Sequence, residues 1–297
     1  MPVAQTVSAP NQIPQISNAS TAPAITTLDD DDFLFRTTPS DAYQGVAAAR
    51  LAAEAGDTNV AVLYLNNDYG EGLAQAFEEA MTAAGGTVTA SQAFEPNQAS
   101  YRSDLQVLAN SGADALVLVA YPDDGGLTIL RQALEEGLFD RFILTDGMKA
   151  EGLLTEIGGE YLEGAYGTAA RAVESDASEV WREAFEAAYG EMPPVPYIDG
   201  AYDAAWILML AIEKAGSTDG TAIRDAIREV SSAPGEKVMP GEWEKAKELI
   251  AAGTDIDYVG AAGEHEFDEN GDVSGTFEHW AILDGQIQSV AVFDPSE

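Results

Sequence analysis

Polar and aromatic side chains follow three apolar runs of the sequence at the points where those runs end. Asn66–Tyr69 follow the run at 60–65, Tyr121 follows the run at 115–120, and Asp146 follows the run at 141–145. In open α/β sheets, ligands bind outside the carboxyl ends of the strands. Tyrosine rings contact cations and cover alkyl chains, while a carboxylate pairs with the charge. These residues therefore predict a pocket for an ammonium group, with a helix cap at Tyr69 and a turn at Asp146 as open alternatives.

The residue types of common catalytic and metal sites are largely missing. The sequence has no cysteine and only two histidines, His265 and His279. We expect each histidine either to face solvent or to have its hydrogen bonds satisfied within a strand. It contains no H-E-x-x-H, G-x-S-x-G or P-loop motif. Residues 266–278 resemble a calcium-binding loop, but Glu278 comes one residue too late, and we interpret Asn270-Gly271 as a turn. We therefore predict a binding protein rather than an enzyme, without metal or other cofactor.

The elements that would position the predicted pocket alternate between strands and helices. Strands are predicted at 60–65, 87–94, 115–120 and 141–145, and helices at 73–84, 101–110 and 127–136. The runs at 60–65 and 115–120 are continuously apolar, which is typical of strands buried on both faces. Alternating strands and helices favour parallel pairing through right-handed crossovers, so the sequence predicts an α/β fold.

The second half of the sequence is predicted to be mainly helical before a region of hairpins. Helices are predicted at 150–157, 177–189, 199–215 and 221–230, with a further, mostly polar one within 239–258. Asn270-Gly271 and Asp284-Gly285 stand between apolar runs, which is typical of hairpin turns. We interpret the acidic run at 29–32 as a solvated turn.

Charge is the most unusual property of the composition. Aspartate and glutamate number 51 against 14 lysines and arginines, which gives a formal net charge of −37. Such a surface repels nucleic acids and anionic lipids, so neither is expected as a partner. We interpret the acidity as an adaptation to high salt, which screens repulsion between carboxylates. An acidic extracytoplasmic protein at ordinary salt is the alternative.

The length and hydropathy of the chain fit a protein with substantial cores. With 297 residues, 46% of them hydrophobic, it can form one large domain or two lobes. No apolar run approaches the roughly 18 residues needed to span a membrane. Residues 1–10 lack the basic and apolar regions of a signal peptide.

Several segments together resemble the branched-chain amino-acid (Leu/Ile/Val-type) substrate-binding proteins of ABC importers. These segments are PQISNASTAP (14–23), FRTTPSDAYQG (35–45), VAVLYLNNDYGEGLA (60–74), TILRQALEEG (128–137), ILTDG (143–147) and YDAAWIL (202–208). The resemblance covers essentially the whole chain. It implies the type I periplasmic-binding-protein fold, whose two α/β lobes are Rossmann-like parallel sheets flanked by helices. It places lobe one at 1–39 and 170–275, and lobe two at 40–169 and 276–297.

The resemblance also implies which residues contact the ligand. They are Ala19, Ser20, Thr21, Tyr69, Tyr121, Asp146 and Tyr202. By position, the backbone of Ala19 and the backbone and hydroxyl of Thr21 would hold the α-carboxylate of an amino acid, with Ser20 between them. Asp146 would receive the α-ammonium, where some members have glutamate. Tyr69 and Tyr121 would form aromatic walls, Tyr202 would line the cleft from lobe one, and Arg36 and Pro39 would belong to the hinge.

The function implied by the resemblance is the capture of a branched-chain or related aliphatic amino acid between two lobes. The bound amino acid would be delivered to an ABC transporter permease by a monomeric protein in the periplasm or at the outer face of the membrane. A sensor of amino acids or amides with the same fold, without transport, is the alternative. Family members carry βα units before the segment that matches residues 3–5, so we expect lobe one to lack its N-terminal part, through a misassigned start or a fragmentary gene. The identity of the ligand stays open.

Overall fold

The computed structural model describes residues 1–193 and 195–295, which form two compact units. Unit 1 comprises Met1–Ser40, Ala172–Pro193 and Tyr197–Gly275. Unit 2 comprises Asp41–Arg171, 195–196 and 276–295. Among the described residues, no helix combines the length and the apolar character needed to cross a membrane.

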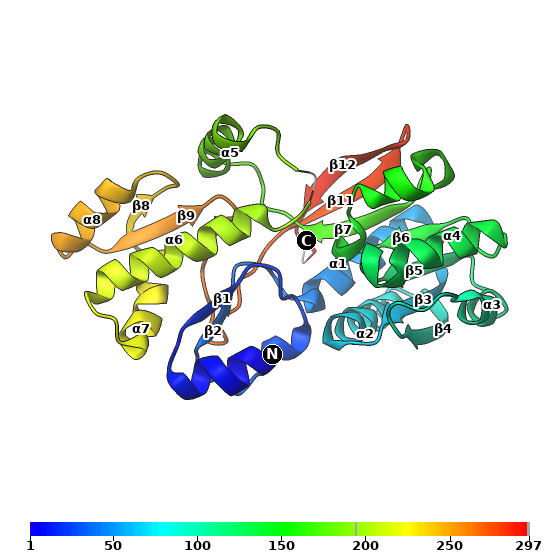
Figure 1. Ribbon diagram of the computed structural model, residues 1–297, viewed down its shortest axis with the longest axis horizontal. Coiled ribbons are helices and arrows are strands. Elements are labelled where there is room, and N and C mark those ends of the chain that lie inside the picture. The colour runs from blue at the N-terminus through cyan, green and yellow to red at the C-terminus, as the bar shows by residue number, and fades with distance from the viewer. Residues whose placement is uncertain (194, 296–297) are drawn as a thin grey trace. The chain divides into compact units, whose positions relative to one another are not determined.

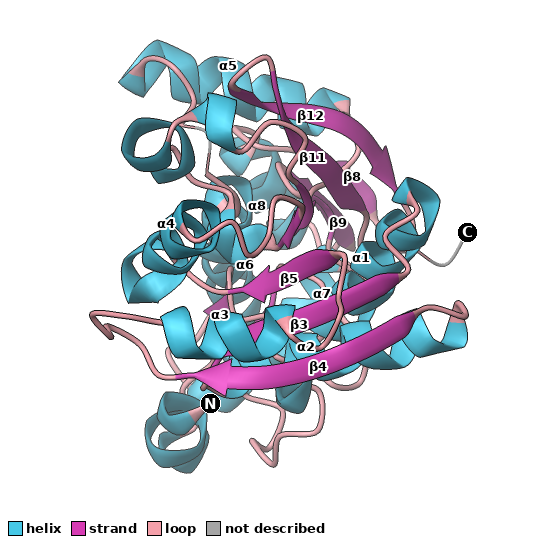
Figure 2. Cartoon of the chain, turned by 90° about the vertical axis from the view of Figure 1, so that its right-hand side faces the viewer, coloured by secondary structure: helices cyan, strands magenta, loops and turns pink. Residues whose placement is uncertain are grey.

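Unit 2 is built on a seven-stranded sheet with the order β12-β11-β7-β6-β5-β3-β4. Its strands are β3 (Asn59–Leu65), β4 (Thr87–Phe94), β5 (Ala115–Val119), β6 (Phe142–Leu144), β7 (Tyr166–Ala170), β11 (Phe277–Leu283) and β12 (Gln286–Phe293). The pairs from β4 to β7 are all parallel, and β3, β4 and β5 run side by side in Figure 2. β11 pairs antiparallel with both β7 and β12. The predicted α/β fold is confirmed.

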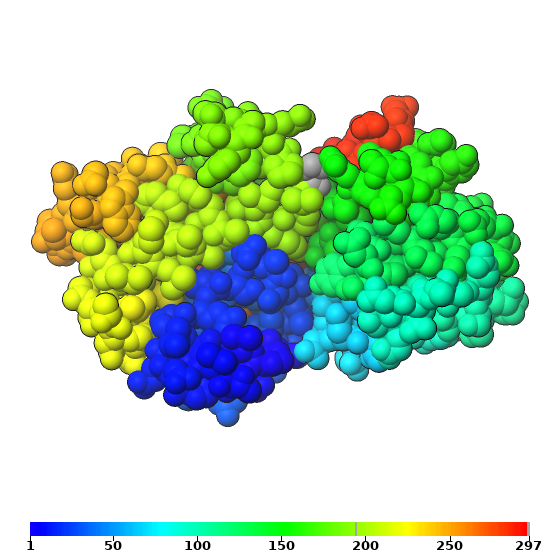
Figure 3. Space-filling model, in the orientation of Figure 1, coloured from blue at the N-terminus to red at the C-terminus, as the bar shows by residue number. Residues whose placement is uncertain are grey.

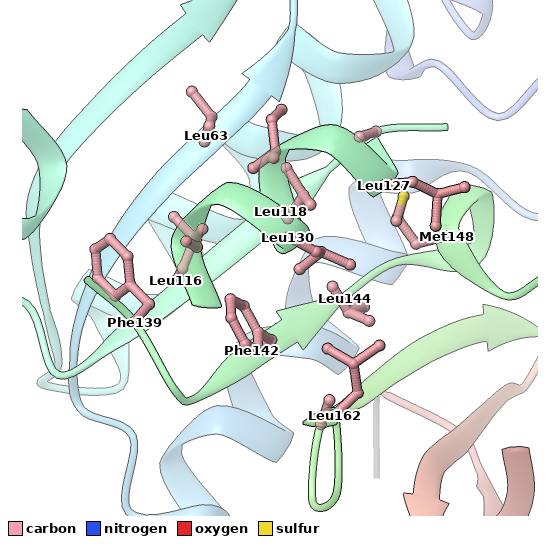
Figure 4. Close-up of a cluster of buried hydrophobic side chains, with 14 of the residues drawn as sticks. Leu63, Leu116, Leu118, Leu127, Leu130, Phe139, Phe142, Leu144, Met148 and Leu162 are labelled. Carbon is pink, nitrogen blue, oxygen red and sulfur yellow. The ribbon is translucent and has the colours of Figure 1, made fainter. Parts of the chain in front are cut away.

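Helices cover both faces of the unit 2 sheet, which explains its continuously apolar strands. The helices are α1 (Asp41–Ala55), α2 (Asp68–Ala83), α3 (Arg102–Ala109) and α4 (Leu127–Glu135) (Figure 1). Val60 and Val62 of β3 belong to one buried cluster with Phe77 of α2. The alternate residue Leu63 belongs to a second cluster with Leu130 of α4, part of which Figure 4 shows. Because successive strand residues point to opposite faces, both sets must be apolar.

Unit 1 contains two small sheets and four α-helices. β1 (Gln15–Ser17) pairs parallel with β2 (Leu34–Arg36), and β8 (Glu236–Val238), β9 (Ile256–Gly260) and β10 (Gly263–Glu264) form a sheet in the order β10-β9-β8. The helices are α5 (Asp176–Tyr189), α6 (Ile198–Ala215), α7 (Gly220–Ser231) and α8 (Trp243–Ala251). Phe35, Trp206, Ile227 and Tyr258 lie in its core. The N-terminal segment lies at the surface beside α6 (Figure 3).

Short helical turns complete the described structure. They lie at Ala4–Ser8, Ala9–Asn11, Pro23–Ile25, Pro122–Gly126, Asp146–Met148, Leu153–Ile157 and Gly159–Tyr161. Asp30 in the predicted acidic turn accepts a hydrogen bond from the N–H of Leu34 at 2.8 Å, and Asp32 pairs with Arg228. This acidic run is therefore a turn that leads into β2.

Three predictions about local structure are wrong in part. The helix predicted within 239–258 is only α8, because Gly253 leaves the helical conformation (φ +72°) and Ile256 begins β9. The turn at Asn270-Gly271 does not join paired strands, because Asp268 Oδ1 accepts the N–H of Asn270 at 2.8 Å and closes a local loop. His265 neither faces solvent nor lies in a strand, because it is buried in unit 1. The hairpin at Asp284-Gly285 joins β11 to β12 as predicted.

Candidate ligand-binding site

Tyr69, Tyr121 and Asp146 come together in unit 2, at the carboxyl ends of its parallel strands. The Tyr69 hydroxyl donates a hydrogen bond to Asp146 Oδ1 at 2.8 Å. The rings of Tyr69 and Tyr121 stack, with centroids 5.0 Å apart and planes inclined by 25°. Tyr69 and Asp146 are 8% and 4% exposed, respectively. The three side chains thus form one cluster of a carboxylate and two phenol rings, in which Tyr121 is partly exposed.

Tyr69 and Asp146 are each positioned by a short-range feature of the sequence. Tyr69 lies in the first turn of α2, which begins before the predicted residue 73 because the Asn67 side chain caps it by accepting the Gly70 N–H at 2.8 Å. The helix-cap alternative for Tyr69 is therefore wrong. Asp146 does open a turn, and its side chain still enters the cluster. A methyl group at Gly147 would lie 2.5 Å from the Ala120 carbonyl oxygen, so this close approach requires glycine.

Gln44, in the first turn of α1, joins the cluster and was not predicted. Its Nε2 donates to Asp146 Oδ1 at 3.0 Å and to two oxygen atoms of Thr168, each at 3.2 Å. The hydroxyl of Thr145 lies 2.9 Å from that of Tyr69. The available signal was a polar Gln44 inside the 35–45 segment, at the start of an alanine-rich helix. Its partners are 102 and 124 residues away in sequence, so no local pattern identifies them.

The electrostatics of the cluster favour a cationic guest. Burial raises the pKa of Tyr69 well above its ordinary value, and the carboxylates of Asp146 and Asp41 raise it further. The pKa of Tyr121 is raised by burial and then by the same two acids. Both phenols therefore stay protonated, and the hydroxyl of Tyr69 donates to Asp146. Two carboxylates close to two ring faces form an environment in which a positive charge is stabilised.

The residues predicted to bind a carboxylate lie in a loop of unit 1 between β1 and the turn at Pro23–Ile25. Ala19 and Ser20 are exposed, whereas Thr21 is buried. Ser17 Oγ accepts the N–H of Ser20 at 3.1 Å. Within the part of the chain that the structure describes, neither the N–H groups of Ala19 and Thr21 nor the Thr21 hydroxyl has a hydrogen-bond partner. These groups are donors of the kind that an anion accepts.

Arg36, predicted as a hinge residue, holds this loop in place. It is fully buried, and its Nη1 donates to the carbonyl oxygens of Thr21 at 3.0 Å and of Ser20 at 3.5 Å. Its Nε and Nη2 donate to the Asp272 carboxylate at 2.6 and 2.7 Å. A trans peptide directs its C=O and N–H to opposite sides. The carbonyl of Ser20 faces Arg36, so the N–H of Thr21 points away from it.

Tyr202 lies in an aromatic cluster of unit 1 and not in this loop. Its ring contacts Trp206 and Trp181, with centroids 5.9 and 6.2 Å away. The α6 residue next to the loop is Gly200, whose carbonyl oxygen accepts the Thr37 hydroxyl at 3.0 Å. A role of Tyr202 in ligand binding stays a prediction. Among the described residues, no group of three or more acidic, histidine or cysteine side chains could hold a metal ion.

Comparison with known proteins identifies the family. The family described as receptor family ligand binding region matches residues 1–284. A leucine-, isoleucine-, valine-, threonine- and alanine-binding protein of Pseudomonas aeruginosa is 31% identical over 215 residues, 72% of this chain and 57% of that protein. The chemotactic signal transduction system substrate-binding protein BasB of Halobacterium salinarum is 25% identical over 256 residues, 84% of this chain and 59% of that protein. The chain thus spans less than two thirds of the length of these curated relatives.

A solved structure agrees with these relatives. The crystal structure of a leucine-binding protein, LivK from Thermotoga maritima, matches with a TM-score of 0.81 and 28% identity, covering 99% of this chain and 76% of that chain. The parallel sheet of unit 2, with helices on both faces, is part of this shared fold. The chain belongs to the receptor ligand-binding-region family, and it shares the type I periplasmic-binding-protein fold of the leucine-binding protein from Thermotoga maritima.

Proposed function

We propose that the chain binds an amino acid, with the α-ammonium at the Asp146 cluster of unit 2. The observation that carries the proposal is the buried Asp146 carboxylate, which Tyr69 and Gln44 hold beside the stacked tyrosine rings. An ammonium group there would form charge-assisted hydrogen bonds in a site of low dielectric constant and lie against aromatic faces. The α-carboxylate would accept hydrogen bonds from the 18–21 loop of unit 1.

The ligand we propose is a branched-chain or related aliphatic amino acid. The specificity in the name of the Pseudomonas aeruginosa relative supports an aliphatic side chain. One face of the Tyr121 ring stacks on Tyr69, and an aliphatic side chain could pack against the apolar surface of this ring. Ser20 and Tyr202 stay proposed contacts, and we propose that units 1 and 2 act as the two lobes that close on the ligand.

We propose delivery of the bound amino acid to an ABC transporter permease, by a monomer located outside the cytoplasmic membrane. A second function, sensing without transport, is favoured by the match to BasB, a substrate-binding protein of a chemotactic system. Uptake of the ligand by proteoliposomes that contain the candidate permease would distinguish the two. Uptake that does not depend on this protein would favour the sensor.

The Asp146→Ala variant tests the binding proposal. We expect a thermal-shift screen of amino acids and amides to find an amino acid that stabilises the wild type. Asp146→Ala should weaken its binding at least about thirtyfold, because a buried ammonium loses its countercharge. Asp140→Ala, at the opposite end of β6 and exposed, is the control and should bind as the wild type does. Equal affinities of the Asp146→Ala variant and the wild type by calorimetry would place the ammonium elsewhere.

A further inference from the structure

The two ends of the Gln44 side-chain amide differ in their hydrogen bonding. Gln44 is 1% exposed, and its Nε2 is used three times, by Asp146 and by two oxygens of Thr168. Its Oε1 is buried and accepts no hydrogen bond from any residue that the structure describes. Burying an acceptor without a donor costs free energy, and such groups in native proteins usually have a partner outside the chain.

The neighbours of this amide fix its orientation. Exchanging the oxygen and nitrogen would place Oε1 against the Asp146 carboxylate and the Thr168 carbonyl oxygen, neither of which donates a hydrogen bond. Nε2 must therefore face Asp146. The oxygen and nitrogen of one amide are about 2.3 Å apart, so Oε1 lies within roughly 5.5 Å of Asp146 Oδ1. A group that donates to Gln44 Oε1 is thus also close to the Asp146 carboxylate.

The surroundings of Gln44 Oε1 select the kind of donor. The Gln44 amide contacts the Asp146 carboxylate, and Asp41 lies three residues before Gln44 on α1, so two carboxylates are close to this position. A donor that carries positive charge is favoured there over a neutral one. A primary ammonium has three N–H groups and can donate to a carboxylate and to an amide oxygen at the same time.

We infer that Gln44 is a ligand-binding residue whose Oε1 accepts a hydrogen bond from the α-ammonium group, while its Nε2 positions Asp146. This inference rests on the proposed amino-acid-binding function. The site then has two acceptors for the ammonium group, the charged Asp146 carboxylate and the neutral Gln44 Oε1, and both select for N–H donors. Discrimination between amino acids and their deaminated analogues therefore depends on Gln44 as well as on Asp146.

The experiment measures that discrimination in the full chain. Gln44→Met keeps the length of the side chain and removes both of its polar ends. The probes are L-leucine and 4-methylpentanoate, which differ only in the amino group, or the amino acid found in the screen and its deaminated counterpart. We expect Gln44→Met to bind L-leucine roughly tenfold more weakly or worse, while the affinity for 4-methylpentanoate changes less than about twofold.

Gln132→Met is the matched control. Gln132 is also a buried glutamine of unit 2, but its Oε1 accepts the Tyr101 N–H at 2.8 Å and its Nε2 donates to the Ala99 carbonyl oxygen at 3.3 Å. Both of its ends are satisfied within the chain, so its role is structural. Gln132→Met should lower the melting temperature and leave the ratio of the two affinities unchanged.

The outcomes separate this inference from the proposed function. If the wild type binds L-leucine and Gln44→Met changes both affinities by the same factor, or neither, the inference is overturned while amino-acid binding stands. An ordered water would then be the partner of Gln44 Oε1. A wild type that binds no amino acid would overturn both proposals. Selective loss of L-leucine binding in Gln44→Met alone would support the inference.

Discussion

Glu278 on β11 and Asp203 on α6 are both buried carboxylates, but they are held by opposite kinds of partner. Glu278 of unit 2 pairs with two cations, Lys149 and Arg171, the latter at 2.5 Å. Among the described residues, Asp203 of unit 1 accepts hydrogen bonds from three neutral donors. These are the Tyr258 hydroxyl at 2.8 Å and the N–H groups of Ala261 at 2.8 Å and Ala262 at 2.7 Å.

The difference in partners gives the two acids opposite pKa shifts. Burial disfavours the carboxylate form of Glu278, but Lys149, helped by a hydrogen bond from Ser289 and by Arg171, outweighs burial and holds the pKa of Glu278 below its ordinary value. Burial of Asp203 exceeds the effect of its neutral donors and raises its pKa to about 7. In a chain with 14 lysines and arginines against 51 acids, Glu278 is thus a buried acid that meets two of the few cations, whereas Asp203 is held by neutral donors.

The largest effect is expected from Glu278→Gln. This change leaves Lys149 and Arg171 without their shared carboxylate, and breaking a buried pair costs about 3–5 kcal/mol. Because both cations are partly exposed, we expect the lower end of this range for unit 2. Hydrogen exchange of the amides in β7 and β11 would measure the loss in unit 2 itself.

The corresponding change at Asp203 sharpens the contrast. Asp203→Asn should alter the protection of unit 1 amides and leave β7 and β11 unaffected, since Tyr258, Ala261 and Ala262, which donate to Asp203, lie in unit 1. If Glu278→Gln leaves β11 protection unchanged, the two cations do not stabilise the folded unit, and the comparison with Asp203 fails.

The second prediction concerns the pH dependence of unit 1, where Asp203 and His265 oppose each other. His265 Nε2 lies 3.5 Å from Asp203 Oδ2, and burial lowers the His265 pKa from 6.5 to about 4. The raised pKa of Asp203 contributes stability that is lost as the pH rises from 3.8 through about 7. The lowered pKa of His265 makes stability fall as the pH decreases from 6.5 to about 4. The two slopes cancel between about pH 4 and 6.5.

His265→Gln removes one of these slopes. We expect unit 1 of the variant to gain stability on acidification from about pH 6.5, on the order of 1 kcal/mol per pH unit. The wild type should stay nearly flat over the same range. Urea unfolding followed by tryptophan fluorescence reports mainly unit 1, which contains Trp181, Trp206 and Trp243. A flat profile in the variant would mean that Asp203 is not protonated in the folded unit.

The sequence predicted best the features that depend on near neighbours. The alternating segment predicted as a strand at 87–94 is β4, and the apolar run at 60–65 lies in β3, because alternation and a continuous apolar run are both local signatures of a strand. The start of α2 was missed by five residues, since the cap depends on the single side chain of Asn67.

Buried polar residues were the hardest to predict. Gln44 and His265 are polar residues whose burial is decided by partners far away in sequence, such as Asp146 and Asp203. A polar residue in a sequence says nothing about which distant segment will cover it. The meeting of Tyr69 with Asp146 could be predicted, because the carboxyl ends of parallel strands lie at one edge of a sheet.

The smallest expected effect comes from an exposed acid and tests the interpretation of the acidic surface. Glu54 pairs with Arg50 one turn away on α1 at 3.0 Å, and both side chains are exposed. Glu54→Gln should cost only about 0.3 kcal/mol at low salt and nothing measurable in molar salt, because screening acts on exposed charges. The cost of Glu278→Gln should be the same in both conditions, because its carboxylate is buried.

The melting temperature of the wild type should rise with salt if repulsion among exposed acids opposes folding. A melting temperature that is flat or falls with salt would contradict the proposed adaptation to high salt. If the free-energy cost of Glu278→Gln also fell with salt, burial would not distinguish Glu278 from the exposed Glu54.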